Sequence, residues 1–255
     1  MCQEVVIVSA ARTPFDKFGG LMKNMSTVEL AAMTIKEVVA RAKVEPKDVE
    51  ELYLGINMPT QNRSIARQAA LSAGLPEETN ALTVDRACCS SIAAIAMGYR
   101  AIALGEAKIC VGGGSENMSN VPYFISDLRW GKRIGDVVLK DIMVVSCPYT
   151  GVPRAVQAGY GADKYGVTRE EQDEWAFNSH KKYFIAQEQN KFAEEILPIT
   201  LKGKKGDTII NCDQSPRADI SMEALAKLKT VYNSSTVTAG NAPGLNTGAA
   251  TMLLM

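Results

Sequence analysis

The sequence of 255 residues contains a single histidine, His180, and its six cysteines form no C-x-x-C pair. Because structural zinc sites use clustered cysteine and histidine ligands, this scarcity argues against a metal site of that kind. The 28 basic and 28 acidic residues cancel, so the charge indicates neither a nucleic-acid partner nor an anionic membrane surface. No apolar run approaches the ~20 residues that a membrane-spanning helix needs. We therefore expect no metal, no nucleic acid and no membrane partner.

The first residues also lack a basic stretch followed by a long apolar run, so they do not resemble a secretory signal. Without export, a disulfide framework is not expected, and the predicted localisation is cytoplasmic with reduced thiols. The six cysteines are Cys2, Cys88, Cys89, Cys110, Cys147 and Cys212. A hydrophobic content of 46% is ordinary for a globular protein, and the length suits one large domain or two smaller ones.

Predicted strands and helices alternate through the first 120 residues. Continuous apolar runs predict strands, of which the first is expected to be buried on both faces; these runs are 4–10, 51–57, 81–87 and 107–114. Helical spacing of apolar residues recurs at 26–42, 64–76 and 90–105. Ser26 and Glu29 have the spacing of a capping box. This alternation predicts crossover connections and a largely parallel sheet.

The character of the chain changes after residue 121. A capping box from Thr168 to Glu171 opens a long amphipathic helix at 168–189, and a lysine-glycine turn centres a hairpin at 196–210. We predict an inserted α/β domain over 121–240. The remaining residues, 1–120 and 241–255, are predicted to form the first domain, with the final apolar run returning to its sheet.

Cys88 and Cys89 lie where a predicted strand turns into a helix rich in small residues. A thiol at a helix N-terminus lies near unpaired N–H groups and the positive end of the dipole, which favours a nucleophilic thiolate. Small neighbours would also let a substrate carbonyl approach an N–H group able to hold an oxyanion. Cysteine is, however, among the most buried residue types, so simple packing is the alternative interpretation.

Six segments resemble, in the same order, motifs of the thiolase family. The segment VDRACCSS at 84–91 is similar to the acyl-enzyme signature V-N-K-x-C-G-S-G, which places Cys88 on the nucleophile that accepts an acyl group. Cys89 and Ser91 then stand where the family usually has glycine. The other segments are VSAARTPFDKFGG, ARQAALSAGLP, GGGSENMSNVPYF, KYGVTREEQDEWA together with LAKLKTVYN, and TAGNAPGLNTGAATMLLM. We expect GGGSEN to form a tight turn beside the active centre.

The resemblance implies an α/β fold: one thiolase half with a βαβαβαββ mixed sheet, carrying an inserted α/β loop domain for CoA binding and oligomerisation. It implies acyl-CoA as substrate, with no permanently bound cofactor. Arg217 falls near the adenine and phosphates of CoA, with a surface arginine as the alternative. Ala242, Pro243 and Gly244 fall in the loop that lies along pantetheine.

Arg154 stands where the family usually has a methionine that covers the acyl pocket. We hypothesise that Arg154 recognises a carboxylate or another polar group on the acyl chain. The alternative is that the loop has shifted and that Arg154 faces solvent.

The resemblance also implies groups that this sequence does not supply. In thiolases a carboxy-terminal half contributes a G-H-P histidine, a second catalytic cysteine in a C-x-G motif and an N-E-x-F asparagine. His180 precedes a lysine and is expected to be a bystander, and Cys2, Cys110, Cys147 and Cys212 match no catalytic position. The carboxy-terminal catalytic domain is absent from the 255 residues.

The leading interpretation is therefore one subunit of a two-polypeptide thiolase. It would perform reversible acyl transfer, by 3-oxoacyl-CoA thiolysis or by Claisen condensation of acetyl-CoA, with a complementary carboxy-terminal-half polypeptide. A dimer of heterodimers or a larger assembly is expected by resemblance. The alternatives are a non-catalytic thiolase-like module that binds acyl-CoA or stabilises a partner, and a truncated fragment.

Overall fold

The computed structural model describes residues 3–58, 63–144, 147, 149–204 and 206–255; Cys2 lies outside them. The chain forms two compact units. Unit 1 comprises Met1–Val121, Phe192–Gln214 and Leu245–Met255, and unit 2 comprises Pro122–Lys191 and Ser215–Gly244.

Unit 1 is built around a six-stranded mixed sheet in the order β1-β10-β5-β3-β4, in which β2 also pairs with β10. Strand β3 runs parallel to β4 and β5, whereas β10 is antiparallel to β1 and β5. The strands are β1 (Ile7–Arg12), β2 (Asp16–Lys17), β3 (Glu51–Gly55), β4 (Asn80–Val84), β5 (Cys110–Asn117) and β10 (Asn246–Leu254). The predicted α/β fold with a mixed sheet is confirmed, including the return of the final strand to this sheet.

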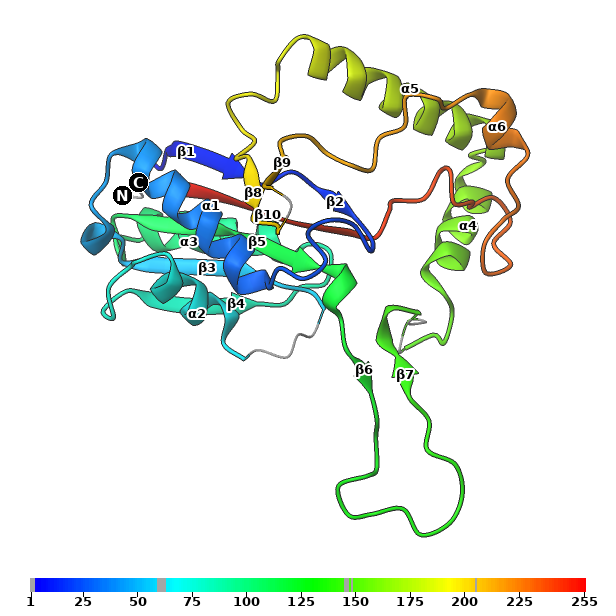
Figure 1. Ribbon diagram of the computed structural model, residues 1–255, viewed down its shortest axis with the longest axis horizontal. Coiled ribbons are helices and arrows are strands. Elements are labelled where there is room, and N and C mark those ends of the chain that lie inside the picture. Colours follow the sequence, from blue (N-terminus) through cyan, green and yellow to red (C-terminus); the bar gives the residue numbers. More distant parts are fainter. Residues whose placement is uncertain (1–2, 59–62, 145–146, 148, 205) are drawn as a thin grey trace. The chain divides into compact units, whose positions relative to one another are not determined.

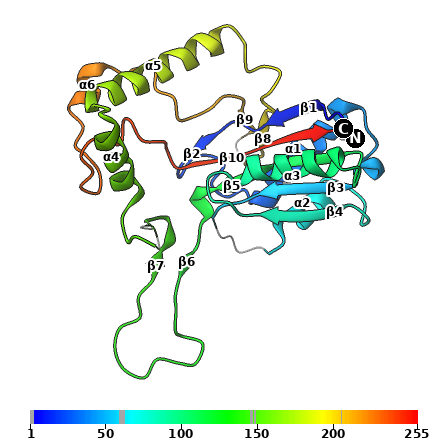
Figure 2. The same ribbon diagram turned by 180° about the vertical axis from the view of Figure 1, so that it is seen from behind.

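Three helices cover the two faces of this sheet. Helices α1 (Thr27–Ala42) and α2 (Ile65–Ser72) pack on one face, and α3 (Ser90–Ala103) packs on the other, as Figures 1 and 2 show from opposite sides. The predicted capping box of α1 is present, with Ser26 and Glu29 each bonding the other's backbone N–H. Because side chains alternate between faces along a strand, Leu52 and Leu54 join the α1–α2 core while Tyr53 packs on the α3 side.

Strand β1 differs from the strand predicted at 4–10. It begins at Ile7 and lies at the edge of the sheet. Val6, Ile7 and Val8 are 50%, 60% and 42% exposed, so the expectation of burial on both faces was wrong. The physical reason is the placement of α3, which packs against β3 and β5 and leaves this end of the sheet without a second covering layer.

The predicted hairpin is confirmed as β8 (Ile199–Leu201) paired with β9 (Thr208–Ile210). It belongs to unit 1, however, and not to an inserted domain over 121–240. Ile199 and Ile210 are buried in one apolar cluster with Met22, Leu30 and Ala249. Burial of these two side chains against α1 and β10 explains why the segment 192–214 is part of unit 1.

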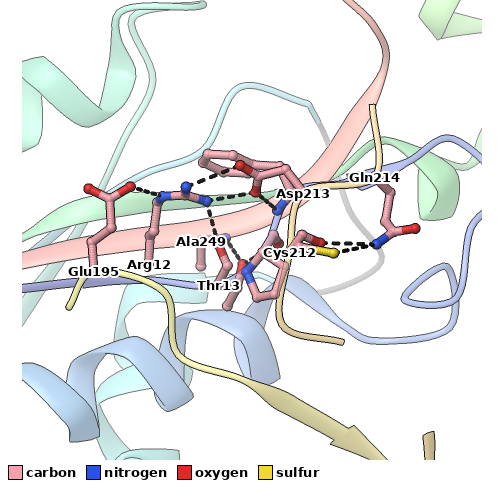
Figure 3. Close-up of polar contacts among 9 residues, drawn as sticks. Arg12, Thr13, Glu195, Cys212, Asp213, Gln214 and Ala249 are labelled. Carbon is pink, nitrogen blue, oxygen red and sulfur yellow. Dashed lines mark hydrogen bonds and ion pairs between the residues drawn. The ribbon is translucent and has the colours of Figure 1, made fainter. Parts of the chain in front are cut away.

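Arg12 at the end of β1 binds the same segment (Figure 3). Its guanidinium donates to both carboxylate oxygens of Asp213, at 2.7 and 3.1 Å, and to Glu195 at 2.9 Å. Its flat face also lies over the rings of Phe15 and Phe192, at 5.0 and 5.6 Å from their centroids. A bidentate, half-buried arginine pair of this kind orients the segment more firmly than a surface ion pair would.

Unit 2 contains three helices and a small hairpin, which are α4 (Arg154–Tyr165), α5 (Arg169–Glu188), α6 (Met222–Ala226), β6 (Tyr123–Phe124) and β7 (Lys140–Asp141). A long loop joins β6 to β7 (Figure 1). The predicted capping box of α5 is present between Thr168 and Glu171. Three short 3-10 turns complete the regular structure of the described residues, at Pro46–Asp48, Met118–Asn120 and Ile142–Val144.

Candidate functional site

The carboxyl ends of the three parallel strands meet at one edge of the sheet in unit 1. Gly55 of β3 is in register with Val84 of β4 and Gly114 of β5. The segments that follow these residues therefore lie next to one another, and one of them carries Cys88. In open α/β sheets this is the edge at which ligands bind.

A tight turn presents Cys88 in front of α3. Ala87 has a left-handed backbone, with φ at 51°, and Cys89 is the N-cap of the helix. Ser90 closes the turn, because its hydroxyl accepts from the N–H of Arg86 at 2.8 Å and donates to the carbonyl of Ala87 at 2.6 Å. Cys88 itself is exposed. The structure thus places an accessible thiol at a helix N-terminus, where backbone N–H groups and the helix dipole favour negative charge.

Glycines on β3 and β5 allow the start of α3 to lie directly on the sheet. A Cβ atom on Gly55 would overlap the backbone of Ser90 and Ser91, and one on Gly114 would overlap the hydroxyl of Ser91. The prediction that GGGSEN forms a tight turn was wrong, because all six of its residues lie in β5. These glycines serve close packing of the cysteine-bearing turn rather than a change of chain direction.

Glu116 was not singled out from the sequence, yet it shares this edge of the sheet. Its carboxylate accepts from the backbone N–H of Asn57 at 3.0 Å and from that of Met58 at 3.3 Å. Burial, followed by the negative charge of Asp85, raises the pKa of Glu116, while the two backbone hydrogen bonds act in the opposite direction. The side chain thereby ties the loop after β3 to the end of β5. In the sequence, only the position of this glutamate next to an apolar strand could have indicated that Glu116 belongs to the site.

The residues expected to contact CoA all lie in unit 2. Arg217 is exposed, and its backbone N–H donates to Nδ1 of His180 at 3.0 Å. Burial and the charge of Arg217 both lower the pKa of His180. Ala242 is half-buried and donates its N–H to the carbonyl of Thr238 at 3.1 Å, while Pro243 and Gly244 are exposed. His180 is thus a partner of the Arg217 segment.

Arg154 is the first residue of α4 and is exposed. Its guanidinium donates to the side-chain carbonyl of Gln157 at 2.8 Å, one turn along the same helix, and Gln157 donates to Thr150 at 3.0 Å. One nitrogen of the guanidinium is thereby used within unit 2, and the other N–H groups of the guanidinium remain as donors for a ligand.

The thiols outside the cysteine pair differ sharply in their surroundings. Cys110 begins the pattern Cys110-Val111-Gly112, which has C-x-G spacing, but the residue is buried in β5 and burial raises its pKa to about 12. Cys147 is half-buried, and hydrogen bonds from the side chain and backbone of Thr150 and from the backbone of Tyr149 lower its pKa to about 6. Cys110 is therefore unsuited to acid–base work near neutral pH, whereas Cys147 ionises there.

Two further findings concern the described residues as a whole. They contain no group of three or more His, Cys, Asp or Glu side chains placed to hold a metal ion. None of their helices combines the length and the apolar character needed to cross a membrane.

Comparison with known proteins agrees with this architecture. The family model for the thiolase N-terminal domain matches residues 5–255. An acetyl-CoA acetyltransferase of Rhizobium meliloti is 41% identical over 98% of this chain, and a beta-ketoadipyl-CoA thiolase of Pseudomonas aeruginosa is 40% identical over 100% of this chain. The chain spans 65% and 66% of the lengths of these two relatives.

A solved structure gives the same result in three dimensions. The acetyl-CoA acetyltransferase of Bacillus anthracis superposes on the whole chain with a TM-score of 0.95 at 39% identity, and 66% of that protein is covered. Sequence and fold therefore agree over all of the described elements. The chain belongs to the thiolase family, and what it contains is the thiolase N-terminal domain.

Proposed function

We propose that this chain carries the acyl-accepting half of a thiolase and transfers acyl groups between CoA thioesters, with Cys88 as the nucleophile. The single observation that supports this most is the exposed Cys88 thiol in front of α3, at the edge where the parallel strands end. Family membership supports the choice of a thioester substrate, because the similar proteins are named as acetyl-CoA acetyltransferases and thiolases.

The proposed reaction begins with the Cys88 thiolate attacking the carbonyl carbon of an acyl-CoA. A bond forms between sulfur and carbon, and the carbonyl oxygen gains negative charge that the positive end of the α3 dipole would stabilise. Collapse leaves an acyl thioester on Cys88. The leaving group is CoA thiolate from acetyl-CoA, or the acetyl-CoA carbanion from a 3-oxoacyl-CoA, and it takes a proton from an acid.

No catalytic motif in these 255 residues supplies the base that deprotonates Cys88 or the acid that protonates the leaving group. The one histidine, His180, is bonded to the Arg217 segment in unit 2, and the C-x-G cysteine, Cys110, is buried. A general acid or base commonly raises the reaction rate by a factor of about 10²–10⁴. We propose that a complementary thiolase half supplies both groups, either in continuation of this chain or as the separate polypeptide that we favour.

An exposed apolar layer on unit 1 supports a complementary half. On α3, Ile92 and Tyr99 are 71% and 52% exposed, and Leu104 at its C-cap is 69% exposed. Val8 of β1 is also exposed, at 42%. An apolar surface of this kind on a folded domain marks an interaction site, and a second layer of helices would fit beside α3.

Acetylation of Cys88 in the assembled enzyme tests this function. The chain is co-expressed with a complementary half containing G-H-P and a second catalytic cysteine, the complex is treated with acetyl-CoA, and its peptides are analysed by mass spectrometry. We expect an acetyl group on the peptide of Cys88, none in Cys88→Ala, and retained labelling in Cys89→Gly. A verified complex that remains unlabelled would favour the non-catalytic acyl-CoA-binding module instead.

For the acyl chain we propose a substrate that carries a carboxylate, recognised by Arg154. The supporting observations are the exposed guanidinium at the start of α4 and the 40% identity to a protein named beta-ketoadipyl-CoA thiolase. In Arg154→Met, we expect the ratio of kcat/KM for a carboxylated 3-oxoacyl-CoA over acetoacetyl-CoA to fall by about tenfold, the loss of one charged hydrogen bond. An unchanged ratio would leave Arg154 as a solvent-facing residue.

A further inference from the structure

One stripe of α5 binds three separate segments of unit 2. Arg169, Asp173 and His180 are spaced four and seven residues apart, so they lie on one face of the helix. Arg169 donates to the carbonyls of Leu225 and Leu228, and His180 accepts from the Arg217 N–H. Asp173 binds the third segment.

Asp173 is 3% exposed and is fully engaged by two partners. One carboxylate oxygen accepts from Nε of Arg169 at 2.8 Å, and the other accepts from the side-chain amide of Asn241 at 3.0 Å. A buried carboxylate is costly unless its charge is paired and hydrogen-bonded, and here Arg169 supplies the pairing. The second oxygen is thereby fixed as an acceptor aimed at Asn241.

Asn241 in turn organises the loop around it. Its side-chain oxygen accepts from the N–H of Thr238 at 2.8 Å, and its amide also donates to the carbonyl of Thr236 at 3.2 Å. The loop then closes on Thr238, whose carbonyl accepts from Ala242 and whose hydroxyl accepts from Gly240. The bonds to Thr238 N–H and to Thr236 depend directly on the orientation of the Asn241 amide.

The other side of the loop is confined by α6. A Cβ atom on Gly240 would overlap Leu225 and would lie 2.6 Å from Cδ1 of Leu228. Arg169 holds the carbonyls of these same two leucines. The loop thus lies between the Arg169–Asp173 pair and the leucines whose carbonyls Arg169 binds, and Gly240 packs closely against the ends of their side chains.

We propose that Asp173 is a positioning residue for CoA: through Asn241 it fixes the segment Ala242–Gly244 against which the pantetheine arm of an acyl-CoA binds. This inference rests on the proposed function, because it takes the loop to contact CoA. The effect of Asp173 would be on affinity for CoA rather than on the acyl-transfer step.

Single and paired substitutions of Asp173 and Asn241 test the proposal in the complex of the chain with its complementary half. In Asp173→Asn an amide replaces the carboxylate, so one of the two donors, Arg169 or Asn241, loses its acceptor. In Asn241→Asp two carboxylates face each other. In the double variant, the carboxylate at 241 still accepts from Thr238 and from the new amide at 173, so we expect partial recovery. Glu174→Gln, on an exposed carboxylate of the same helix, is the matched control.

Three measurements are made on each variant: the Kd for CoA by titration, KM and kcat for thiolysis, and hydrogen–deuterium exchange of residues 236–244. For Asp173→Asn we expect about a tenfold rise in Kd and KM, as for loss of one charged hydrogen bond, with kcat nearly unchanged and faster exchange in 236–244. The double variant should recover part of both effects, and Glu174→Gln should match the wild type.

Several outcomes would overturn the inference. Wild-type affinity in Asp173→Asn would do so, as would faster exchange in 236–244 without any change in affinity for CoA. A parallel fall of kcat with faster exchange throughout unit 2 would show a purely structural role. Failure of the proposed function is distinguishable, because it appears in the wild type as no Cys88 acetylation, whereas the titration and exchange measurements do not depend on acylation.

Discussion

Ser91, in the first turn of α3, lies so close to Gly114 of β5 that a Cβ atom on Gly114 would overlap its hydroxyl. The same Cβ atom would lie 2.8 Å from the carbonyl oxygen of Gly55. The turn that presents Cys88 is therefore seated directly on strand backbone, and the contact is sensitive to single atoms.

The first prediction concerns Gly114→Ala. We expect a loss of about 1–3 kcal/mol in the free energy of unfolding, because the added methyl overpacks a rigid contact. Adding Ser91→Gly should recover part of the loss, since it removes the overlapping hydroxyl. Urea unfolding measures both effects. Gly161→Ala is the control, because a Cβ atom on Gly161 in α4 meets nothing within 4 Å; equal destabilisation in the two variants would contradict the prediction.

The second prediction concerns Glu116, whose pKa is raised by burial and by the charge of Asp85. Because its folded-state pKa is above the unfolded value, Glu116 contributes stability that is present below the unfolded value and lost as the pH rises through the folded one. In Glu116→Gln, an uncharged isostere, this part of the pH dependence should disappear. The check is the unfolding free energy of both proteins, measured from pH 4 upward because the ordinary pKa of glutamate is ~4.3. If its pH dependence is the same in Glu116→Gln as in the wild type, Glu116 is not the titrating group.

The third prediction concerns Cys147, whose pKa is lowered to about 6 chiefly by a hydrogen bond from the Thr150 side chain. At pH 7 this thiol is mostly thiolate, whereas burial keeps Cys110, with a pKa of about 12, as a thiol. We expect iodoacetamide to modify Cys147 long before Cys110. Thr150→Val should slow the reaction at Cys147, and Thr150→Ser, which keeps the hydroxyl, should not. Peptide mass spectrometry measures the extent of modification at Cys147 and Cys110 in the wild type and at Cys147 in the two Thr150 variants.

The fourth prediction concerns His180, whose pKa is lowered by burial and by Arg217. A lowered folded-state pKa means that stability is present above the unfolded value of about 6.5 and is lost as the pH falls through the folded value. Protonated Nδ1 cannot accept the Arg217 N–H. After correction for the pH dependence of the intrinsic chemical rate, amide hydrogen–deuterium exchange at 215–220 should therefore be faster at pH 5 than at pH 7. In His180→Gln this difference between the two pH values should disappear. An equal difference in the variant would show another titrating group.

The fifth prediction concerns the exposed side of α3. Tyr99 is 52% exposed, so Tyr99→Lys should change the stability of unit 1 by no more than about 0.5 kcal/mol. If a complementary half covers this face, burial of the new charge should weaken association by at least about tenfold. Tyr99→Phe, which keeps the ring, should associate normally. Analytical ultracentrifugation of the co-expressed halves decides, and undiminished association of the lysine variant would place the interface elsewhere.

The sequence was most informative where local chemistry decides structure. The capping boxes at Ser26 and Thr168 and the alternation of strands and helices all appear as expected, because each depends on residues a few positions apart. Burial of Val6 to Val8 was misjudged since it depends on which layer covers β1, and no local pattern contains that information. The segment 192–214 was misplaced for a similar reason, because Arg12 and Asp213 are far apart in sequence.

The candidate site shows the same division. Cys88 could be predicted as the nucleophile because the residues around it resemble a family signature, and this role stays a prediction. Glu116 and Asp173 were not, because their importance comes from partners on other elements, Asn57 for one and Asn241 for the other.

Strand β10 lies between β1 and β5, although it is the last strand of this sheet to be synthesised. At about 5–20 residues per second, the roughly 130 residues between Asn117 and Asn246 take about 6–25 s to make. During that interval β1 has no neighbour and one side of β5 is open, with unpaired N–H and C=O groups available to other nascent chains. Unit 1 therefore completes its sheet only after translation has passed β10, and aggregation in expression hosts should respond to translation speed and chaperone supply.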